Sequence, residues 1–353
     1  MTQKICRLGL VATALLLSLL PATGAAQNGV QQFAELGQCK LQSGKVIEHC
    51  RVGYRTFGSL NAARDNAVVM PTWLYGVSGD LVQFFGAQPS NQRLVDTSKF
   101  FGVALDAFGN GVSSSPSNSK AQPGADFPQF TTGDMVEAQY RVVTEVLHLK
   151  HLYAVVGLSM GGEQTYMWAS LHPQFFDLAV PVIATPRLTT YDLLTKQVML
   201  ESIVRDPAYK NGRYTVEPEL KLANLLGGLV VTSPAYRNQE TPRADFESFV
   251  KKSESPIAFD ANDRVWQMRA VMAHDIIGNR PLEQVAKASP QHYMIIVSAL
   301  DRMVNPQPSL AWAAAKGAPT YISQGPCAHL IMTCDAAAVS TRVQEFLRKG
   351  RLP

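Results

Sequence analysis

The sequence has 353 residues, of which 46% are hydrophobic, and it carries 32 Lys and Arg residues against 28 Asp and Glu residues. The formal net charge is only +4 and no basic run stands out, so neither nucleic acid nor an anionic membrane is an expected partner. A chain of this length can bury a large core, and no repeat or low-complexity linker divides it, so we expect one domain with an insertion.

The first residues predict export. Lys4 and Arg7 precede an apolar stretch at 8–20, and small residues follow at 22–26. This is the pattern of a secretory signal peptide, and the stretch is too short to span a membrane as a helix. We therefore expect residues 1–26 to be cleaved, leaving a secreted or periplasmic chain without a membrane anchor. Loss of Lys4 and Arg7 lowers the formal charge to +2.

An even number of cysteines follows the predicted signal peptide, which in an exported protein favours disulfides over free buried thiols. The four are Cys39, Cys50, Cys327 and Cys334. Four cysteines allow three pairings. Cys39 and Cys50 flank Ser43-Gly44, a probable hairpin turn, which makes a local bond between them plausible. A two-residue turn would place Cys39 opposite Glu48 and Cys50 diagonally across. The complementary pair is then Cys327 with Cys334.

Beyond the hairpin, short β-rich runs alternate with longer amphipathic stretches. This alternation predicts an α/β fold with a mostly parallel, doubly wound sheet. The expected strands are 67–70, 101–105, 153–156, 294–298 and 320–323. Apolar residues recur at helical spacing in 133–149 and 340–347.

The clearest chemical motif lies at 157–161, which reads GLSMG. A β-rich run precedes this G-x-S-x-G motif and a helical stretch follows it, as in a nucleophile elbow. Such a turn strains the backbone of the serine, and side chains in place of Gly157 or Gly161 would collide with neighbouring chain. Ser159 is therefore the predicted nucleophile, and the Met160 amide is expected to face an oxyanion. The alternative is an ordinary turn serine.

The pattern changes between about 187 and 287. Helical spacing appears at 193–204 and 220–229, and strand signals are scarce. We interpret this segment as a helical cap inserted between two strands of the sheet. The alternative is a set of helices packed on the face of the sheet.

A serine nucleophile needs a base and an acid that orients the base, in the order Ser, acid, His. Three histidines follow the serine motif and its helix. His274 falls within the expected cap and His292 at the start of a strand, whereas His329 lies in a loop before the last helix. His329 is therefore the predicted base. Asp301, which follows a strand, is the predicted acid; the alternative for Asp301 is the N-cap of a helix at 309–316.

The predicted base stands between two cysteines in the segment 325–335, GPCAHLIMTCD. A bond between Cys327 and Cys334 would close the loop that carries His329 and limit its movement. The alternative is a zinc site, but zinc takes three or four ligands and no second Cys/His cluster offers the fourth. The sequence thus predicts neither a metal nor a cofactor.

Four further segments carry longer motifs. They are GYRTFGSLNAARDNAV at 53–68, DMVEAQ at 134–139, VGLSMGG at 156–162 and DPAY at 206–209. Together they resemble the homoserine O-acetyltransferase-like family of α/β-hydrolase-fold proteins, and the resemblance extends over about residues 39–347.

The resemblance implies an α/β-hydrolase fold with a helical lid and the triad Ser159, Asp301 and His329. It also implies an oxyanion hole formed by the backbone amides of Leu74 and Met160. Members are often homodimers, so the resemblance allows a homodimer without fixing the oligomeric state.

Three positions depart from the members that acylate homoserine. Leu330 stands where they carry an acid after the histidine, Leu200 where they carry an arginine, and 72–76 reads TWLYG in place of HALTG. An apolar side chain cannot bind the charged groups of homoserine. With Trp73 and Tyr75 as candidate pocket residues, the sequence predicts a secreted esterase for a small, fairly apolar ester. The alternatives are an acyltransferase with another acceptor and a non-catalytic binding protein on the same scaffold.

Overall fold

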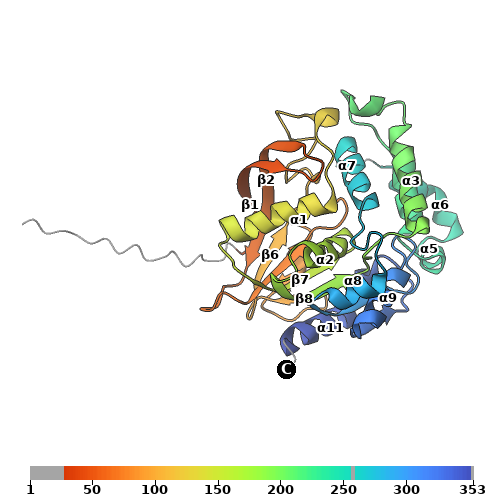
Figure 1. Ribbon diagram of the computed structural model, residues 1–353. Helices are drawn as coiled ribbons and strands as arrows, with labels where there is room; N and C mark the ends of the chain where they lie inside the picture. Colours follow the sequence, from red (N-terminus) through yellow and green to blue (C-terminus); the bar gives the residue numbers. More distant parts are fainter. Residues whose placement is uncertain (1–27, 256–258, 351–353) are drawn as a thin grey trace, which may run out of the picture.

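The computed structural model describes residues 28–255 and 259–350 (Figure 1). The predicted signal peptide lies outside the described residues. No helix in this described part of the chain is long and apolar enough to cross a membrane.

The centre of the fold is a nine-stranded, mostly parallel sheet in the order β1-β2-β6-β3-β7-β8-β10-β11, with β9 beside β8 (Figure 1). Only β1 and β2 run antiparallel to their neighbours. The strands are β1 (Gln32–Lys40), β2 (Val46–Phe57), β3 (Ala67–Pro71), β6 (Phe101–Leu105), β7 (Leu152–Leu158), β8 (Phe176–Val182), β9 (His292–Tyr293), β10 (Ile295–Ser298) and β11 (Thr320–Ser323). Two short strands, β4 (Phe85–Gly86) and β5 (Val95–Asp96), form a separate pair.

Helices cover both faces of the sheet. They are α1 (Thr132–Arg141), α2 (Met160–Leu171), α9 (Gln307–Lys316), α10 (Ile331–Cys334) and α11 (Ala336–Lys349). Side chains alternate between the faces along each strand, so Val155 of β7 packs in the core that includes α1 and α2, while Val156 packs in the core that includes α11. Burial on both faces is what produces near-continuous apolar runs in parallel strands. The α/β fold predicted from the sequence is therefore confirmed.

The cap segment, 187–287, is helical. Its helices are α3 (Thr190–Val204), α4 (Lys221–Val230), α5 (Pro234–Glu240), α6 (Phe246–Ser253), α7 (Ala261–Met272) and α8 (Leu282–Ala288). In Figure 1, α3, α5 and α6 lie together on the right, at one end of the sheet. The helical spacing at 193–204 and 220–229 corresponds to α3 and α4.

The N-terminal hairpin differs in one detail from the two-residue turn. The Leu41 amide donates to Lys45 O at 2.8 Å, so the turn is wider and Cys39 lies opposite Ile47, not Glu48. A register shift then brings Gly37 opposite Cys50. The strands still hold the two cysteines 5.7 Å apart at Cα, and the Cys39–Cys50 disulfide is present.

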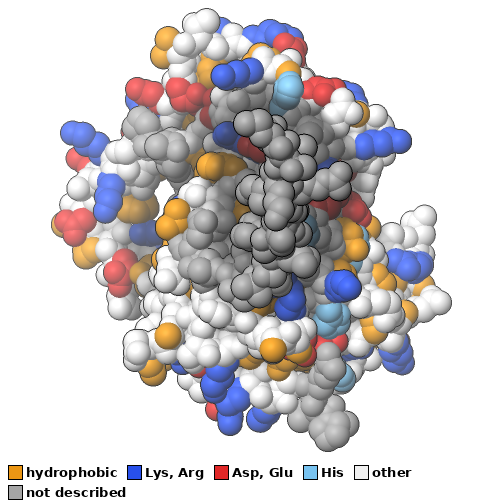
Figure 2. Space-filling view, turned by 90° about the vertical axis from the view of Figure 1, so that its left-hand side faces the viewer, with side chains coloured by type: hydrophobic (Ala, Val, Ile, Leu, Met, Phe, Trp, Pro, Cys, Tyr) orange, Lys and Arg blue, Asp and Glu red, His pale blue; other side chains and the backbone are white. Residues whose placement is uncertain are grey.

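Charged side chains are mixed on the surface. On the part of the face in Figure 2 that is not grey, red and blue side chains are interspersed, with no large area of one sign. This distribution agrees with the small net charge of the sequence.

Candidate active site

Ser159 lies in the sharp turn between β7 and α2. Its backbone has φ 54° and ψ −126°, a strained conformation for a residue other than glycine. A Cβ on Gly157 would collide with the backbone of Gly161, and a Cβ on Gly161 would collide with the carbonyl oxygen of Pro71. The Ser159 amide donates to Val182 O of β8 at 2.9 Å, which fixes the turn above the sheet. The geometry is that of a nucleophile elbow.

The other two predicted triad residues meet Ser159 at this edge of the sheet. His329 Nε2 is 2.8 Å from Ser159 Oγ, and His329 Nδ1 is 2.8 Å from Asp301 Oδ2. The side chain of Asp301 is 1% exposed and that of His329 is 9% exposed. An ionised carboxylate only accepts hydrogen bonds, so Nδ1 carries the proton and Nε2 is left to accept the proton of the serine hydroxyl.

Asp301 is not a helix N-cap, because α9 begins at Gln307 with Pro306 at its N-cap position. Its Oδ1 accepts instead from the Met303 and Val304 amides, at 2.8 and 3.0 Å. These bonds leave Oδ2 free to face the imidazole. The side chain of Asp301 thus stabilises the turn that contains it.

Helix α3 of the cap segment holds this turn from the other side. Lys196, which is 1% exposed, donates through Nζ to Met303 O at 2.9 Å. Asp192 accepts from the Asn305 amide at 2.8 Å and caps α3 through Thr189. The position of the acid is therefore coupled to a helix far from it in sequence.

His274 and His292, the two histidines that were not predicted as the base, do not take part in the triad. His274 is fully buried, with Nδ1 3.1 Å from Thr132 Oγ1 and Nε2 3.1 Å from Thr185 O. Burial lowers the pKa of His274 to about 4, so it is a neutral structural residue at neutral pH. His292 opens β9 and is exposed.

The loop that carries His329 is closed by the Cys327–Cys334 disulfide, with the two Cα atoms 5.8 Å apart. Hydrogen bonds add to this closure, since Ser323 Oγ donates to Asp335 and the Leu330 amide donates to Cys327 O at 3.0 Å. Both cysteines are bonded to each other and are not available as metal ligands.

A cavity of about 720 Å³ opens over Ser159 and His329. Its wall is mostly apolar or aromatic and includes Trp73, Leu74, Tyr75, Phe84, Ile183, Met199, Ala223, Val231, Met303, Leu330 and Met332. Trp73 and Tyr75, the candidate pocket residues, therefore both lie beside the serine and the histidine. The volume suits a small organic molecule.

The two candidate oxyanion amides belong to Leu74, which lines the cavity, and to Met160, which directly follows the lining residue Ser159. Leu74 lines the cavity just after β3, and Met160 is the first residue of α2. Among the described residues, no acceptor binds either the Leu74 or the Met160 amide. The Met160 amide stands at the start of a helix, a position suited to binding developing negative charge.

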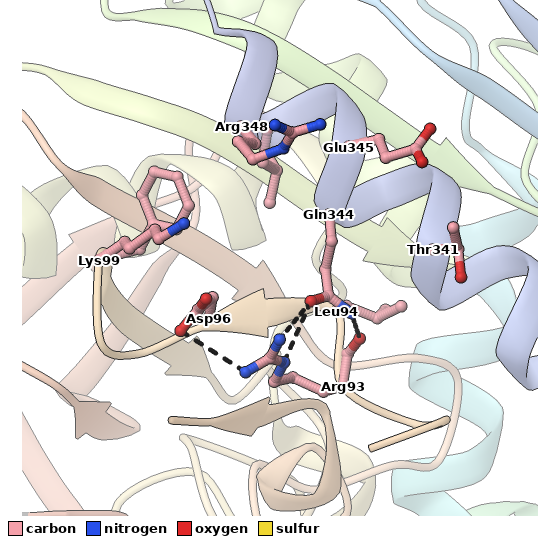
Figure 3. Close-up of a pocket in the computed structure, with 10 residues that line it drawn as sticks. Arg93, Leu94, Asp96, Lys99, Thr341, Gln344, Glu345 and Arg348 are labelled. Atoms are coloured by element: carbon pink, nitrogen blue, oxygen red, sulfur yellow. Dashed lines mark hydrogen bonds and ion pairs between the residues drawn. The ribbon is translucent and has the colours of Figure 1, made fainter. Parts of the chain in front are cut away.

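A second cavity of about 330 Å³ lies against α11 and shares no lining residue with the first (Figure 3). Three of its polar residues contact each other: Arg93 donates through Nη2 to Gln344 Oε1 at 2.6 Å and lies 3.6 Å from Asp96. Gln344 Nε2 in turn donates to Arg93 O at 2.8 Å. These contacts fasten α11 to the segment around β5, and the larger cavity remains the candidate active site.

A buried acid stands one helical turn after Ser159. Glu163 is 1% exposed, and Oε2 has no hydrogen-bond partner within the described chain. Burial raises its pKa to about 7; Lys196 lowers the pKa and Asp192 raises it, both to a smaller extent. Glu163 therefore keeps its proton in the folded protein at pH values where the unfolded chain has lost it.

This pKa predicts a pH-dependent cost to stability. Between about pH 4.5 and 7 the folded state binds one more proton than the unfolded state, so stability falls as pH rises. Glutamine cannot ionise, so Glu163→Gln should escape this loss. We expect the free energy of unfolding of the variant, relative to that of the wild-type protein, to be roughly 3 kcal/mol higher at pH 8 than at pH 5. Denaturant unfolding of both proteins at the two pH values measures the difference. The exposed control Glu240→Gln should show none, and an equal effect of Glu163→Gln at both pH values would contradict the assignment.

Comparison with known proteins places the chain in a family. The family model of the alpha/beta hydrolase fold matches residues 74–332. A homoserine O-acetyltransferase of Moorella thermoacetica is 30% identical over 288 residues, which cover 70% of this chain and 76% of that protein. The chain belongs to the homoserine O-acetyltransferase-like family of α/β-hydrolase-fold proteins.

Esterases are also similar to this family member. A probable esterase of Corynebacterium glutamicum and an ethyl acetate hydrolase of Pseudomonas veronii are each 34% identical to it, over 198 and 211 residues. The matches cover 56% and 57% of this chain but only 56% and 59% of those two relatives. An acetylester hydrolase of Corynebacterium glutamicum shares the fold with a TM-score of 0.81, over 91% of this chain and 97% of that one, at 24% identity.

The three positions at which this chain departs from the homoserine-acylating members lie in different parts of the structure. Leu330 lines the cavity and is 41% exposed. Leu200 is buried in the core between α3 and its neighbours and is not among the described residues that line the cavity. Trp73 packs edge-on against Phe84 with ring centroids 6.1 Å apart.

Two positively charged side chains at the site were not predicted from the sequence. Lys196 supports the Asp301 turn, and Arg264 of α7 lines the cavity itself. Neither belongs to a motif. The burial of Arg264 becomes apparent only in the structure, where α7 is buried on almost all sides.

Proposed function

We propose that this protein is a serine esterase that cleaves a small carboxylic ester through an acyl-enzyme. The observation that carries the proposal is the continuous Ser159–His329–Asp301 hydrogen-bonded chain, with 2.8 Å at each step, facing a cavity of about 720 Å³. Nucleophile, base and orienting acid within hydrogen-bond reach are what acyl transfer to a serine requires.

In the proposed reaction, His329 Nε2 takes the proton of Ser159 as Oγ attacks the ester carbonyl. Asp301 keeps the imidazole in the required tautomer and stabilises the imidazolium. The Leu74 and Met160 amides donate to the oxyanion. His329 then protonates the departing alcohol, and a water molecule activated by the same histidine releases the acid.

Hydrolysis is preferred over transfer because of the cavity wall. Leu330 offers no negative charge to the ammonium group of an amino-acid acceptor, and no Asp or Glu is present among the described residues that line the cavity. Esterases stand among the relatives, as do homoserine O-acetyltransferases, so transfer to an alcohol is the second candidate.

The deciding experiment compares acid release with acyl transfer. Purified protein is mixed with p-nitrophenyl acetate and butyrate, with and without homoserine and simple alcohols, and separately with acetyl-CoA and homoserine. We expect ester hydrolysis and no O-acetylhomoserine. A product mixture dominated by the transferred acyl group would replace the esterase proposal with the acyltransferase one.

We propose that residues 1–26 direct export and that the protein acts outside the cytoplasm. The two disulfides support this location, since such bonds persist in oxidising compartments.

We also propose that the protein forms a homodimer. Tyr191, Leu194 and Val198 lie exposed on α3, at a spacing that puts them on one face of the helix, and this face is where we expect a second copy to pack.

A further inference from the structure

The cavity over Ser159 contains one buried cation. Arg264 is 4% exposed and is the one Lys or Arg among the described residues that line the cavity. It stands on α7, which packs beside α3 of the cap segment (Figure 1). A buried charge is costly unless it is paired, so its partners decide what it does.

The guanidinium group is held in place but its charge is not neutralised. Nη1 donates to Asn224 Oδ1 at 2.9 Å, and the group lies 5.3 Å from the centre of the Tyr75 ring. Nε is buried without a hydrogen-bond partner, and the Tyr75 side chain also interacts with the guanidinium group. No described Asp or Glu forms an ion pair with Arg264. Its partners are thus a neutral amide and an aromatic face.

The nearest acids do not supply the missing charge. Glu217 accepts from the Ala261 amide at 2.7 Å, and burial, followed by Asp260, raises its pKa to about 7 although Arg264 acts to lower it. Asp263 accepts from Ser117, and burial raises its pKa to about 8. Near neutral pH the Asp263 carboxyl group is thus mostly protonated and that of Glu217 is about half protonated.

Tyr75 and Asn224 hold Arg264 in a fixed position. The Tyr75 amide donates to Gln267 Oε1 at 2.8 Å, and its hydroxyl lies 3.4 Å from Arg264 O. Asn224 Nδ2 donates to Ser255 O at 3.2 Å, so its oxygen is directed at the arginine. A fixed, planar guanidinium with free N–H groups is suited to a carboxylate, which it binds through two parallel hydrogen bonds.

We propose that Arg264 binds a carboxylate of the substrate, so that the enzyme prefers an ester that carries a single negative charge. This inference rests on the proposed esterase function and narrows its substrate class. One cation without a second one nearby favours a monoanion over a phosphate ester. Two sources share this chemistry: a half-ester, with the carboxylate on the acyl side, and an acylated hydroxy acid, with the carboxylate on the alcohol side.

The test compares each anionic ester with its neutral amide. The acyl-side pair is monoethyl adipate and the ethyl ester of adipamic acid; the alcohol-side pair is acetoxyacetate and acetoxyacetamide. We expect kcat/KM of the wild-type protein to favour the carboxylate by roughly tenfold or more in one pair. That ratio should fall to about one in Arg264→Gln and stay at the wild-type value in Arg269→Gln, which removes an exposed arginine of the same helix.

The ratio separates this proposal from a structural role of Arg264, because a general loss of activity affects both members of a pair equally. If Arg264→Gln does not fold, the wild-type ratios decide: no preference for the carboxylate in either pair overturns the proposal. An unchanged ratio in a folded Arg264→Gln overturns it as well. Hydrolysis of p-nitrophenyl acetate by the wild-type protein is the separate check on the esterase function, and its absence would refute that function instead.

Discussion

Ser159→Ala is expected to lower kcat for p-nitrophenyl butyrate by about 10⁵- to 10⁶-fold, because it removes the atom that forms the acyl-enzyme. His329→Ala should cost about as much. The double variant should lose little more than either single one, since nucleophile and base act as a unit. The alanine keeps the Cβ of the serine, so the strained turn at φ 54° is preserved and stability should change little.

Steady-state kinetics with an active-site titration of the wild-type enzyme measure this loss. Ser98→Ala, at an exposed serine far from the cavity, is the matched control and should keep full activity. Unaltered turnover by Ser159→Ala would show that the nucleophile is wrongly assigned. Absence of turnover in the wild-type protein would favour the non-catalytic binding protein.

The second large effect is expected for Asp301→Asn, with a loss of about 10³- to 10⁴-fold in kcat. The reason lies in the turn that the residue builds. The Met303 and Val304 amides both donate to one oxygen, so the side-chain amide of an asparagine must direct its oxygen to them and its NH₂ group to His329. That NH₂ group donates to Nδ1, so the proton moves to Nε2, where it cannot accept from Ser159.

Asp275→Asn is the matched control for this substitution. Asp275 also accepts from two successive amides, those of Ile277 and Gly278, but it lies in the cap segment away from the triad. It should keep the activity of the wild-type protein. An Asp301→Asn variant with more than a tenth of wild-type kcat would contradict the role of Asp301 as the orienting acid.

The fold could be predicted from the sequence where buried strands read as apolar runs. The apolar run at 101–105 matches the buried strand β6 residue for residue, and the β-rich stretch at 320–323 matches β11, an edge strand that is largely exposed. Strand β8 was not predicted, and Pro181 within it is the physical reason. A proline has no N–H for the ladder and argues against a central strand, yet here β8 lies between β7 and β10.

The triad could be predicted because its chemistry imposes local constraints. Gly157 and Gly161 are required by the turn around Ser159, and the order of serine, acid and histidine leaves few candidates. No such local pattern marks the residues that support the triad or the residues that line the cavity. Lys196 and Arg264 acquire their roles only when α3 and α7 pack over the loops of the sheet, and sequence spacing does not report those contacts.

The Cys327–Cys334 bond makes completion of the active site an oxidation event. In a reducing environment the segment that presents His329 would lack this covalent link and would be held by its hydrogen bonds and by the packing of Ile331 in the core. Preparations of the recombinant protein would differ in specific activity according to the fraction of chains that carry the bond, even with identical far-UV spectra. Disulfide occupancy, counted by thiol titration, is therefore the quantity to normalise before rates from different expression hosts are compared.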